Sequence, residues 1–380
     1  MTAPLVVIGT GLAGYNLVKE FRKADAERQV IMITADDGRQ YSKPMLSTGF
    51  SKGKDADGLA MNDAGAMAEQ LKIEIRTHQT ITAINPAEKV VMLGNEALAY
   101  SDLVLALGAE PFQLPIEGSE HLYHVNDLMD YAEFHSAVQG KKRVLVMGAG
   151  LVGCEYAHDL ASAGFEVDLV APDAQPLSRL VPAPVGQALQ PALETLGVSL
   201  HLEKAVTSVS KVGEQYVAHL SDGSQLEADV MLSAVGLKPR VALAQAAAIE
   251  VNRAIVVNQQ LQTSAPHVYA IGDCAEVEGL NLLYVLPLMN GARALAKTLA
   301  GQPTDVKYPV MPVMVKTPSL PIVTCPPAQD SEGEWEFDGQ SPHIKALFKD
   351  SGGNLLGYAL TGDCVAEKMA LNKELPVMLA

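Results

Sequence analysis

The stretch Gly9-Thr10-Gly11-Leu12-Ala13-Gly14 decides the fold, and it directly follows an apolar run at residues 5–8. A second stretch of the same form, Gly148-Ala149-Gly150-Leu151-Val152-Gly153, follows the apolar run at residues 144–147. Between a strand and a helix, the first glycine permits a sharp turn, the second lets a phosphate approach the backbone, and the third lets helix and strand pack closely. The free N–H groups and positive dipole end of the helix then bind phosphates. One copy is weak evidence, but two copies predict two dinucleotide sites in one chain.

Length and composition favour a globular protein of two or three domains. The chain has 380 residues, of which 48% are hydrophobic and 19% charged, values that argue against disorder. No apolar run approaches the roughly 20 residues that span a bilayer. The polar start leads into the first strand with no basic region or cleavage site. We therefore expect a cytoplasmic protein with no membrane partner.

Charge and cysteine usage exclude further classes. Lysine and arginine number 28 against 44 aspartates and glutamates, a net charge of −16, which disfavours nucleic acid as a partner. The nine histidines form no ligand-like cluster, and no metal site is expected. The four cysteines are far apart and show neither C-x-x-C nor zinc spacing, which predicts reduced structural thiols. They are Cys154, Cys274, Cys325 and Cys364.

The two glycine stretches head two similar units. In the first unit, strands are expected at residues 5–8 and 30–33 around a helix at 14–23. Asp36 lies 36 − 14 = 22 residues past Gly14, where a carboxylate is needed for the ribose hydroxyls. With Thr34 and Ala35 before it, Asp36 is a candidate cofactor contact. The second unit repeats the pattern with strands at 144–147 and 167–170 around a helix at 151–162.

A third signature, Thr263-Ser264-Ala265-Pro266-His267-Val268-Tyr269-Ala270-Ile271-Gly272-Asp273, follows the second unit. It delivers Asp273 at the carboxyl end of an apolar strand, where open α/β sheets bind ligands. A helix is expected from near Pro287 to Gly301, and a final helix at 365–371. The predicted fold class is α/β, with two Rossmann-like dinucleotide-binding domains and a small α+β C-terminal domain. The expected boundaries are 1–111 with 238–309 for the first nucleotide domain, 112–237 for the second, and 310–380 for the last.

The order of the three motifs resembles that of the two-dinucleotide flavoprotein reductases with the glutathione-reductase fold. That resemblance implies FAD at the first glycine stretch, NAD(P)H at the second, and contact between Asp273 and the flavin. Disulfide reductases of this group carry a cysteine pair after the second strand, but this chain has Tyr41-Ser42-Lys43-Pro44-Met45-Leu46-Ser47 there. In this it is similar to the rubredoxin reductases and, nearly as closely, to the flavorubredoxin reductases.

The resemblance also implies roles for individual residues. Lys43 would lie by flavin N5 with Glu155 as its partner, and these two are the candidate catalytic residues. Each has a plainer interpretation, a solvated loop lysine and a first-turn glutamate favoured by the helix dipole. Further flavin contacts would be Thr80 near the adenine, a backbone amide at Val285, and Lys316 on a returning strand, although Thr80 and Lys316 could equally be surface residues.

The identity of the nicotinamide nucleotide depends on the residues after the strand at 167–170. Ala171 stands where a ribose-binding carboxylate is usual, with Asp173 two residues on. No arginine follows immediately to accept a 2′-phosphate, Arg179 being the nearest. We therefore expect NADH held through Asp173, with NADPH as the alternative.

Residues 280–320 are locally positive in this acidic chain, with four basic residues (Arg293, Lys297, Lys307, Lys316) against Asp305. A small acidic iron carrier such as rubredoxin could dock there through short-range charge complementarity, unless the charges only solvate a helix. The predicted activity is hydride transfer from NADH to FAD and then single-electron transfer to rubredoxin. Alternatives are flavorubredoxin, ferredoxin or dioxygen as acceptor, and a flavoprotein that acts as a redox-responsive binding module.

Overall fold

The first glycine stretch follows the carboxyl end of the central strand of a five-stranded parallel sheet. The computed structural model describes residues 3–380, and the sheet has the order β20-β9-β1-β2-β5. Its central strand β1 is buried along its whole length, as expected of a parallel sheet covered on both faces. The strands are β1 (Leu5–Ile8), β2 (Val30–Ile33), β5 (Glu74–Arg76), β9 (Asp102–Leu105) and β20 (Val268–Ala270).

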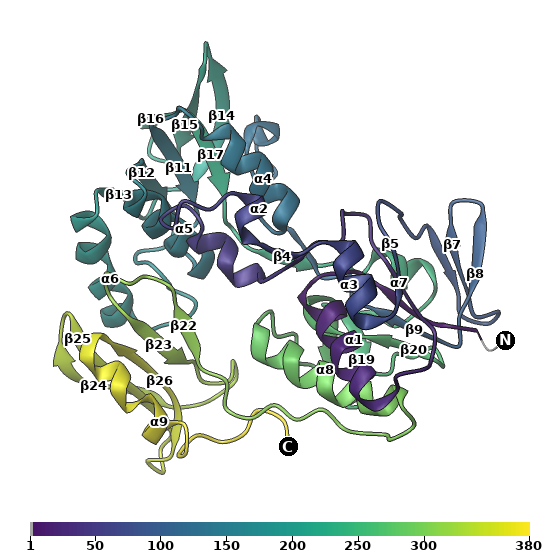
Figure 1. Cartoon of the computed structure of the whole chain (residues 1–380). Helices are drawn as coiled ribbons and strands as arrows, with labels where there is room; N and C mark the ends of the chain where they lie inside the picture. The colour runs from purple at the N-terminus through teal and green to yellow at the C-terminus, as the bar shows by residue number, and fades with distance from the viewer. Residues whose placement is uncertain (1–2) are drawn as a thin grey trace.

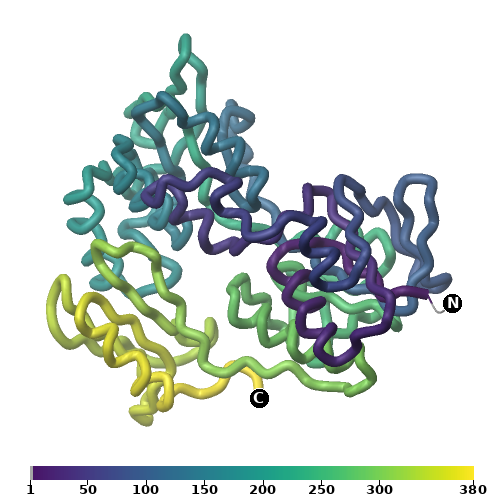
Figure 2. Tube along the Cα trace, viewed as in Figure 1, coloured from purple at the N-terminus to yellow at the C-terminus, as the bar shows by residue number. Residues whose placement is uncertain are grey.

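Two helices far apart in the sequence pack together beside this sheet. The helix α1 (Leu12–Ala24) follows the first glycine stretch, and α8 (Val285–Leu299) follows the third signature. Figures 1 and 2 show their purple and green segments lying side by side in one lobe. The late part of the chain therefore returns to complete the first nucleotide-binding unit.

The second unit repeats this architecture. Its parallel sheet has the order β13-β12-β11-β17, and α5 (Leu151–Ser162) follows the central strand as α1 follows β1. The strands are β11 (Arg143–Met147), β12 (Glu166–Val170), β13 (Val198–His201) and β17 (Val230–Ser233). The predicted duplication and the α/β fold class are confirmed, while the domain boundaries stay a prediction.

Short antiparallel pieces complete and connect the two lobes. The strands β10 (Ala109–Pro111) and β18 (Leu237–Pro239) pair where the chain passes between the two lobes. A short parallel pair, β19 (Ile255–Val257) with β21 (Ala275–Val277), is added to these pieces. The other antiparallel pieces are β3 (Gln40–Tyr41) with β4 (Ala60–Asn62); β6 (Ala83–Asn85), β7 (Val90–Leu93) and β8 (Glu96–Ala99); and β14 (Val206–Val212), β15 (Gln215–Leu220) and β16 (Gln225–Ala228).

The C-terminal part forms its own antiparallel sheet, of order β22-β23-β26-β25-β24, drawn in yellow-green in Figure 1. The prediction of one helix at 365–371 is wrong. A 3₁₀-helix, η4 (Gly362–Glu367), leads instead into a single α-helical turn, α9 (Lys368–Leu371). Only Leu371 of this stretch is fully buried, so packing does not select a longer α-helix. The strands are β22 (Val313–Val315), β23 (Ile322–Cys325), β24 (Glu334–Gln340), β25 (His343–Lys349) and β26 (Leu355–Thr361).

Several helices were not expected from the sequence. The helix α4 (Leu128–Ala137) begins with a capping box in which Asp127 and Asp130 each accept the other's backbone N–H, a local signal that was available. Residues 63–71 do look helical in the sequence, and α3 (Ala64–Leu71) confirms that expectation. The remaining elements are the helices α2 (Ala56–Leu59), α6 (Ala183–Thr195) and α7 (Ala242–Ala246) and the 3₁₀-helices η1 (Lys43–Thr48), η2 (Ser119–His121) and η3 (Gly272–Cys274).

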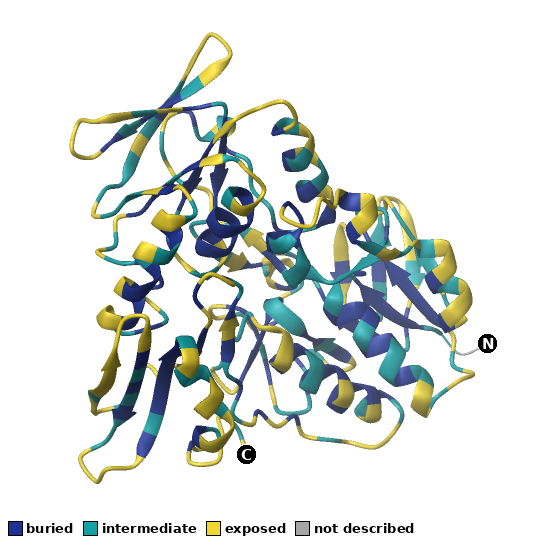
Figure 3. Ribbon diagram, turned by 60° about the vertical axis from the view of Figure 1, so that its left-hand side comes forward, coloured by how far each residue is buried: buried dark blue, intermediate teal, exposed yellow. Residues whose placement is uncertain are grey.

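Burial follows the central strands of the main sheets, which are dark blue in Figure 3, while the hairpin tips, the outer helix faces and the edge strand β24 are largely yellow. Large apolar residues such as Leu5, Leu145 and Leu360 are fully buried, one in each sheet. Over residues 3–380, none of the helices combines the length and apolar character needed to cross a membrane.

Candidate active site

Both glycine stretches open onto one large cavity of about 1810 Å³. It is lined by Gly11 in the first lobe, by Gly150 in the second, and by Lys316 from the C-terminal part. A cavity shared by two phosphate-binding turns brings two nucleotides together. Of the predicted site residues, all except Gly14 and Gly153 line it.

Each glycine of the first stretch is required for a different steric reason. Gly9 has φ +111°, and a Cβ there would lie 2.3 Å from the Ala106 carbonyl oxygen. A Cβ on Gly14 would lie 2.1 Å from the Gly9 carbonyl oxygen, so this glycine serves helix–strand packing. A Cβ on Gly11 would meet nothing within 4 Å. The space above the α1 N-terminus is therefore open, which fits a pyrophosphate group.

The second stretch repeats this arrangement. Gly148 has φ +100°, and a Cβ on Gly153 would lie 1.8 Å from the Gly148 carbonyl oxygen. Gly150, like Gly11, faces open space. Neither Gly11 nor Gly150 provides a side-chain cap for the helix it precedes, which leaves the first helical amides for phosphate oxygens.

Asp36 is oriented by its neighbours at the end of β2. Its Oδ1 accepts hydrogen bonds from Thr34 Oγ1 at 2.7 Å, Thr10 Oγ1 at 3.1 Å and the Gly38 amide at 2.9 Å. Within the described chain, Oδ2 has no such donor. The His78 amide donates to the Asp36 carbonyl at 3.0 Å, which brings exposed Thr80 to the same rim of the cavity as Ala35.

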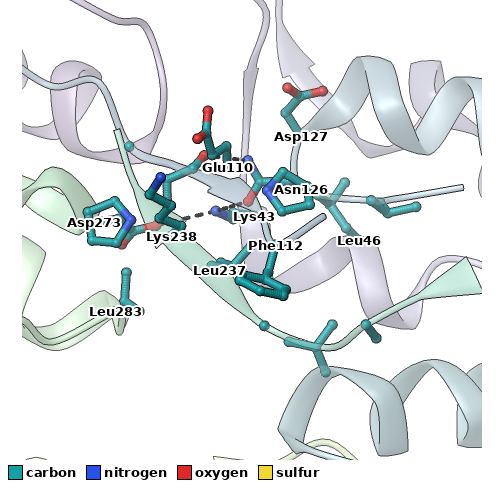
Figure 4. A pocket seen from close by; sticks show the side chains of 18 of the residues that line it. Lys43, Leu46, Glu110, Phe112, Asn126, Asp127, Leu237, Lys238, Asp273 and Leu283 are labelled. Carbon is teal, nitrogen blue, oxygen red and sulfur yellow. Dashed lines mark hydrogen bonds and ion pairs between the residues drawn. The ribbon is translucent and has the colours of Figure 1, made fainter. Parts of the chain in front are cut away.

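The expected pair between Lys43 and Glu155 is wrong. Lys43 Nζ donates to Asn126 Oδ1 at 2.8 Å and lies 3.3 Å from Asp273 Oδ2; Figure 4 shows these three side chains meeting in the cavity. Lys43 stands at the start of η1, and the next turn of that helix presents Ser47, not Lys43, to Glu155.

Glu155 instead pairs with Lys316. The carboxylate is 1% exposed, and it receives the Lys316 ammonium, the Lys316 amide at 3.0 Å and Ser47 Oγ at 2.7 Å. Lys316 directly follows β22, so the C-terminal sheet delivers this cation to the second lobe. Two of the lysines that line the cavity, Lys43 and Lys316, are thus each held by a separate carboxylate. Asn126 and Ser47 were missed by the sequence analysis.

Two further predicted contacts lie on the first lobe. Asp273 sits in η3 after β20, following Gly272 at φ +78°, and its carbonyl accepts Asn281 Nδ2 at 3.0 Å. Val285 is the first residue of α8, and the N-cap residue Tyr284 offers no side-chain cap. The first amides of α8 are therefore available to an electronegative ligand atom.

The buried face of α5 carries three polar side chains that reach other segments. Besides Glu155, Asp159 accepts the amides of Phe50 and Ser51 at 2.9 and 3.1 Å, which holds the chain after η1. His158 Nε2 accepts the Ser319 amide at 3.2 Å, and burial lowers the pKa of this histidine despite Asp159 beside it. Polar residues spaced i, i+3, i+4 on an otherwise apolar helix were a signal for these contacts.

Three of the four thiols are unsuited to redox chemistry because they are buried. All four cysteines are free, and burial raises the pKa of Cys154 to about 12 and those of Cys274 and Cys325 to about 11. A thiol must ionise to react as a nucleophile or in disulfide exchange, so these three stay inert at neutral pH. Within residues 3–380 no cluster of His, Cys, Asp and Glu has the makings of a metal site.

Two equivalent nucleotide turns on one cavity, with lysines but no cysteine among the described residues that line it, define a two-nucleotide flavoprotein reductase. A family model described as pyridine nucleotide-disulphide oxidoreductase matches residues 3–296, and one described as a rubredoxin binding C-terminal domain matches residues 305–375. The chain belongs to the pyridine nucleotide-disulphide oxidoreductase family and, within it, to the rubredoxin-NAD(+) reductases. The cofactors of this family are FAD and a nicotinamide nucleotide.

Known proteins resemble the chain over its whole length. A rubredoxin-NAD(+) reductase from Alcanivorax borkumensis is 53% identical over 379 residues, covering 99% of both chains. A nitric oxide reductase FlRd-NAD(+) reductase from Aeromonas salmonicida is 40% identical, covering 98% of this chain and 96% of that protein. The crystal structure of a ferredoxin reductase from Rhodopseudomonas palustris has a TM-score of 0.88 at 25% identity, covering 99% and 96%.

Proposed function

We propose that the protein transfers reducing equivalents from NADH through FAD to a rubredoxin. The observation that carries this function is the single cavity shared by both phosphate-binding turns, together with the rubredoxin-binding match at residues 305–375, which include Lys316. When bound, FAD supplies the conversion of a two-electron hydride donor into a one-electron donor. The chain supplies binding, orientation and charge.

The first lobe binds FAD. The amides at the start of α1 bind its pyrophosphate, and Asp36 accepts ribose hydroxyls through the oxygen that Thr34 and Thr10 leave free. Ala35 and Thr80 border the adenosine end. Asp273 and the Val285 amide contact the flavin end, where the N-terminus of α8 stabilises negative charge.

Lys43 and Lys316 would stabilise negative charge on the flavin. Each ammonium is held in place before reaction, Lys43 by Asn126 and Asp273 and Lys316 by Glu155. Preorganised charges of this kind act without reorganisation at the moment of reaction. The protein would also hold the two nucleotides in one cavity, and this positioning would supply much of the rate.

The second lobe binds NADH. The amides at the start of α5 bind its pyrophosphate, with Gly148 and Gly153 shaping the turn and Gly150 leaving room for it. Asp173 accepts the adenosine ribose hydroxyls, which favours NADH over NADPH.

Rubredoxin docks on residues 280–320, where Arg293 and Lys297 are exposed on α8. The ion pair with Glu155 already engages the charge of Lys316, so Arg293, Lys297 and Lys307 supply the positive surface.

The location is the cytoplasm, in keeping with four cysteines that are all free.

The test is an anaerobic stopped-flow experiment on the purified yellow protein. NADH should bleach the visible flavin absorbance rapidly, and the absorbance should return only when rubredoxin is added. A colourless protein that cannot be reconstituted with FAD would contradict the proposal. Slow bleaching with no reoxidation by any carrier would favour a redox-responsive binding module instead.

A flavorubredoxin is the second candidate acceptor, favoured by the 40% identical relative whose name specifies it. Reoxidation rates measured side by side with rubredoxin, a flavorubredoxin and a ferredoxin separate these acceptors. The proposal expects rubredoxin to give the highest kcat/KM.

A further inference from the structure

The second lobe places charges of both signs around Asp173. The backbone amides of Glu203 and Lys204 donate to the carbonyls of Asp173 and Ala171, each at 3.0 Å, which lays residues 203–204 against the end of β12. Asp173, Arg179 and Lys204 line the same cavity as Gly150. Any nucleotide bound at Gly150 therefore has two cations and a carboxylate near its ribose end.

The carboxylate of Asp173 is held in one orientation. Ser178 Oγ donates to Asp173 Oδ1 at 2.6 Å. In the part of the chain that the structure describes, Oδ2 has no side-chain or backbone donor. One oxygen is thus engaged by the protein, and the other is left for the vicinal hydroxyls of a ribose.

Lys204 is held by a carboxylate from a neighbouring hairpin. Its Nζ lies 2.9 Å from Asp222 Oδ2, in the turn between β15 and β16. Ser221 fixes this turn to the chain beside Lys204, because its amide donates to the Ala205 carbonyl at 2.9 Å and its Oγ accepts the Ala205 amide at 3.1 Å. The hydrogen bond from Lys204, then those from Ser224, hold the pKa of Asp222 well below its usual range. This partner stays charged at neutral pH.

We propose that Ser178 and Asp222 are specificity-determining residues that make the site select NADH over NADPH, an inference that rests on the proposed function. Ser178 orients the carboxylate that accepts the ribose hydroxyls and repels a 2′-phosphate. Asp222 engages Lys204, which would otherwise bind that phosphate. The site rejects NADPH because Asp222 engages Lys204 and Asp173 repels the 2′-phosphate, not because cations are lacking.

The test measures binding of ADP-ribose and 2′-phospho-ADP-ribose by calorimetry, so it needs neither turnover nor an electron acceptor. Asp222→Asn should strengthen binding of the phosphorylated probe about fivefold, as expected when an exposed ion pair is released, and leave ADP-ribose binding unchanged. Adding Lys204→Met should abolish that gain. Ser178→Ala should weaken ADP-ribose binding about fivefold without weakening the phosphorylated probe, and Ser178→Thr should restore it.

Asp350→Asn is the matched control. Asp350 also accepts amides within a hairpin turn, those of Gly352 and Asn354 at 2.9 and 2.8 Å, but on the C-terminal sheet. Asp350→Asn should change the affinity for neither ADP-ribose nor 2′-phospho-ADP-ribose. Flavin content checks that each variant is folded.

If Asp222→Asn leaves the ratio of the two affinities unchanged, the assignment is overturned while the proposed function stands. Equal losses for both probes in Ser178→Ala would overturn the role of Ser178 in the same way. A wild-type protein that binds neither probe would overturn both the inference and the proposed function.

Discussion

Lys316 forms its ion pair with Glu155 although 161 positions separate them in the chain. Glu155 is buried in α5 of the second lobe, and Lys316 follows β22 of the C-terminal sheet. The pair therefore joins two parts of the protein at the wall of the shared cavity. It also leaves Lys43 to Asn126 and Asp273, so Lys43 and Lys316 have separate partners.

Replacing Glu155 by Gln should lower the stability of the protein and slow flavin reduction by NADH. The neutral amide loses the charge-assisted bonds to Lys316, which should lower the free energy of unfolding by about 1–3 kcal/mol. A less firmly held Lys316 should slow flavin reduction by NADH by roughly tenfold. Urea denaturation and stopped-flow absorbance measure the two effects.

Glu336→Gln provides the matched control for that substitution. Glu336 pairs with Lys349 at 2.6 Å across β24 and β25, but its side chain is 62% exposed. Exposed pairs contribute little to stability, so neither measurement should change. An equal loss of stability in both variants would contradict the special role of the buried pair.

The glycines of the second nucleotide turn should separate folding from binding. In Gly153→Ala the new methyl group collides with the Gly148 carbonyl, and we expect a loss of about 3 kcal/mol or more in stability. Gly150 has φ −74° and open space around it, so Gly150→Ala should fold normally. Its methyl group would occupy the space for pyrophosphate and weaken NADH binding about tenfold or more.

Thermal denaturation and NADH titration distinguish the two variants. Flavin content should stay normal in Gly150→Ala, because FAD binds at the separate turn around Gly11. Unchanged NADH affinity in Gly150→Ala would show that the space at Gly150 is not a binding site.

The glycine turns could be predicted from the sequence because their requirements are local. Tight approaches at Gly14 and Gly153, and open space at Gly11 and Gly150, are set within six contiguous residues. The partner of Glu155 could not be predicted this way. Lys43 and Lys316 are both plausible partners by charge, and the choice depends on where β22 returns in three dimensions.

The helices that were not expected from the sequence differ in how far local sequence could have predicted them. Asp127 and Asp130 mark the start of α4 locally and could have been recognised. Pro191 argues against a helix at α6, because it removes a backbone donor. The burial of Leu189 and Leu193 on either side of it outweighs that cost, and such burial is visible only in the folded protein.

Stability should fall in mild acid partly because of His158. Burial lowers the pKa of His158 from its usual 6.5, so the unfolded chain binds this proton more readily than the folded protein. The loss begins as the pH falls through 6.5 and grows until the lower pKa of the folded state is reached. His158→Gln can still accept the Ser319 amide but cannot be protonated. Its melting temperature should decline less between about pH 7.5 and 5.5, and identical slopes in both proteins would contradict this explanation.

Electron transfer should not require cysteine. Cys154, Cys274 and Cys325 are buried and protonated at neutral pH, whereas Cys364 is only partly buried. Treatment of the native protein with iodoacetamide should give at most one adduct, at Cys364, with no loss of rubredoxin reduction. Intact mass and peptide mapping locate the adduct. A loss of activity that follows modification of Cys154 or Cys274 would show that a thiol takes part.

Charge reversal on α8 tests the docking surface. Arg293 and Lys297 are exposed on this helix, and the combined change Arg293→Glu with Lys297→Glu should raise KM for rubredoxin by about tenfold at low ionic strength. The effect should shrink as salt screens the charges, while the rate of flavin reduction by NADH stays unchanged. The control combines Lys72→Glu with Lys141→Glu, two exposed lysines outside residues 280–320, and so adds the same negative charge elsewhere. If both double variants raise KM equally, net charge rather than a docking site on α8 governs the encounter.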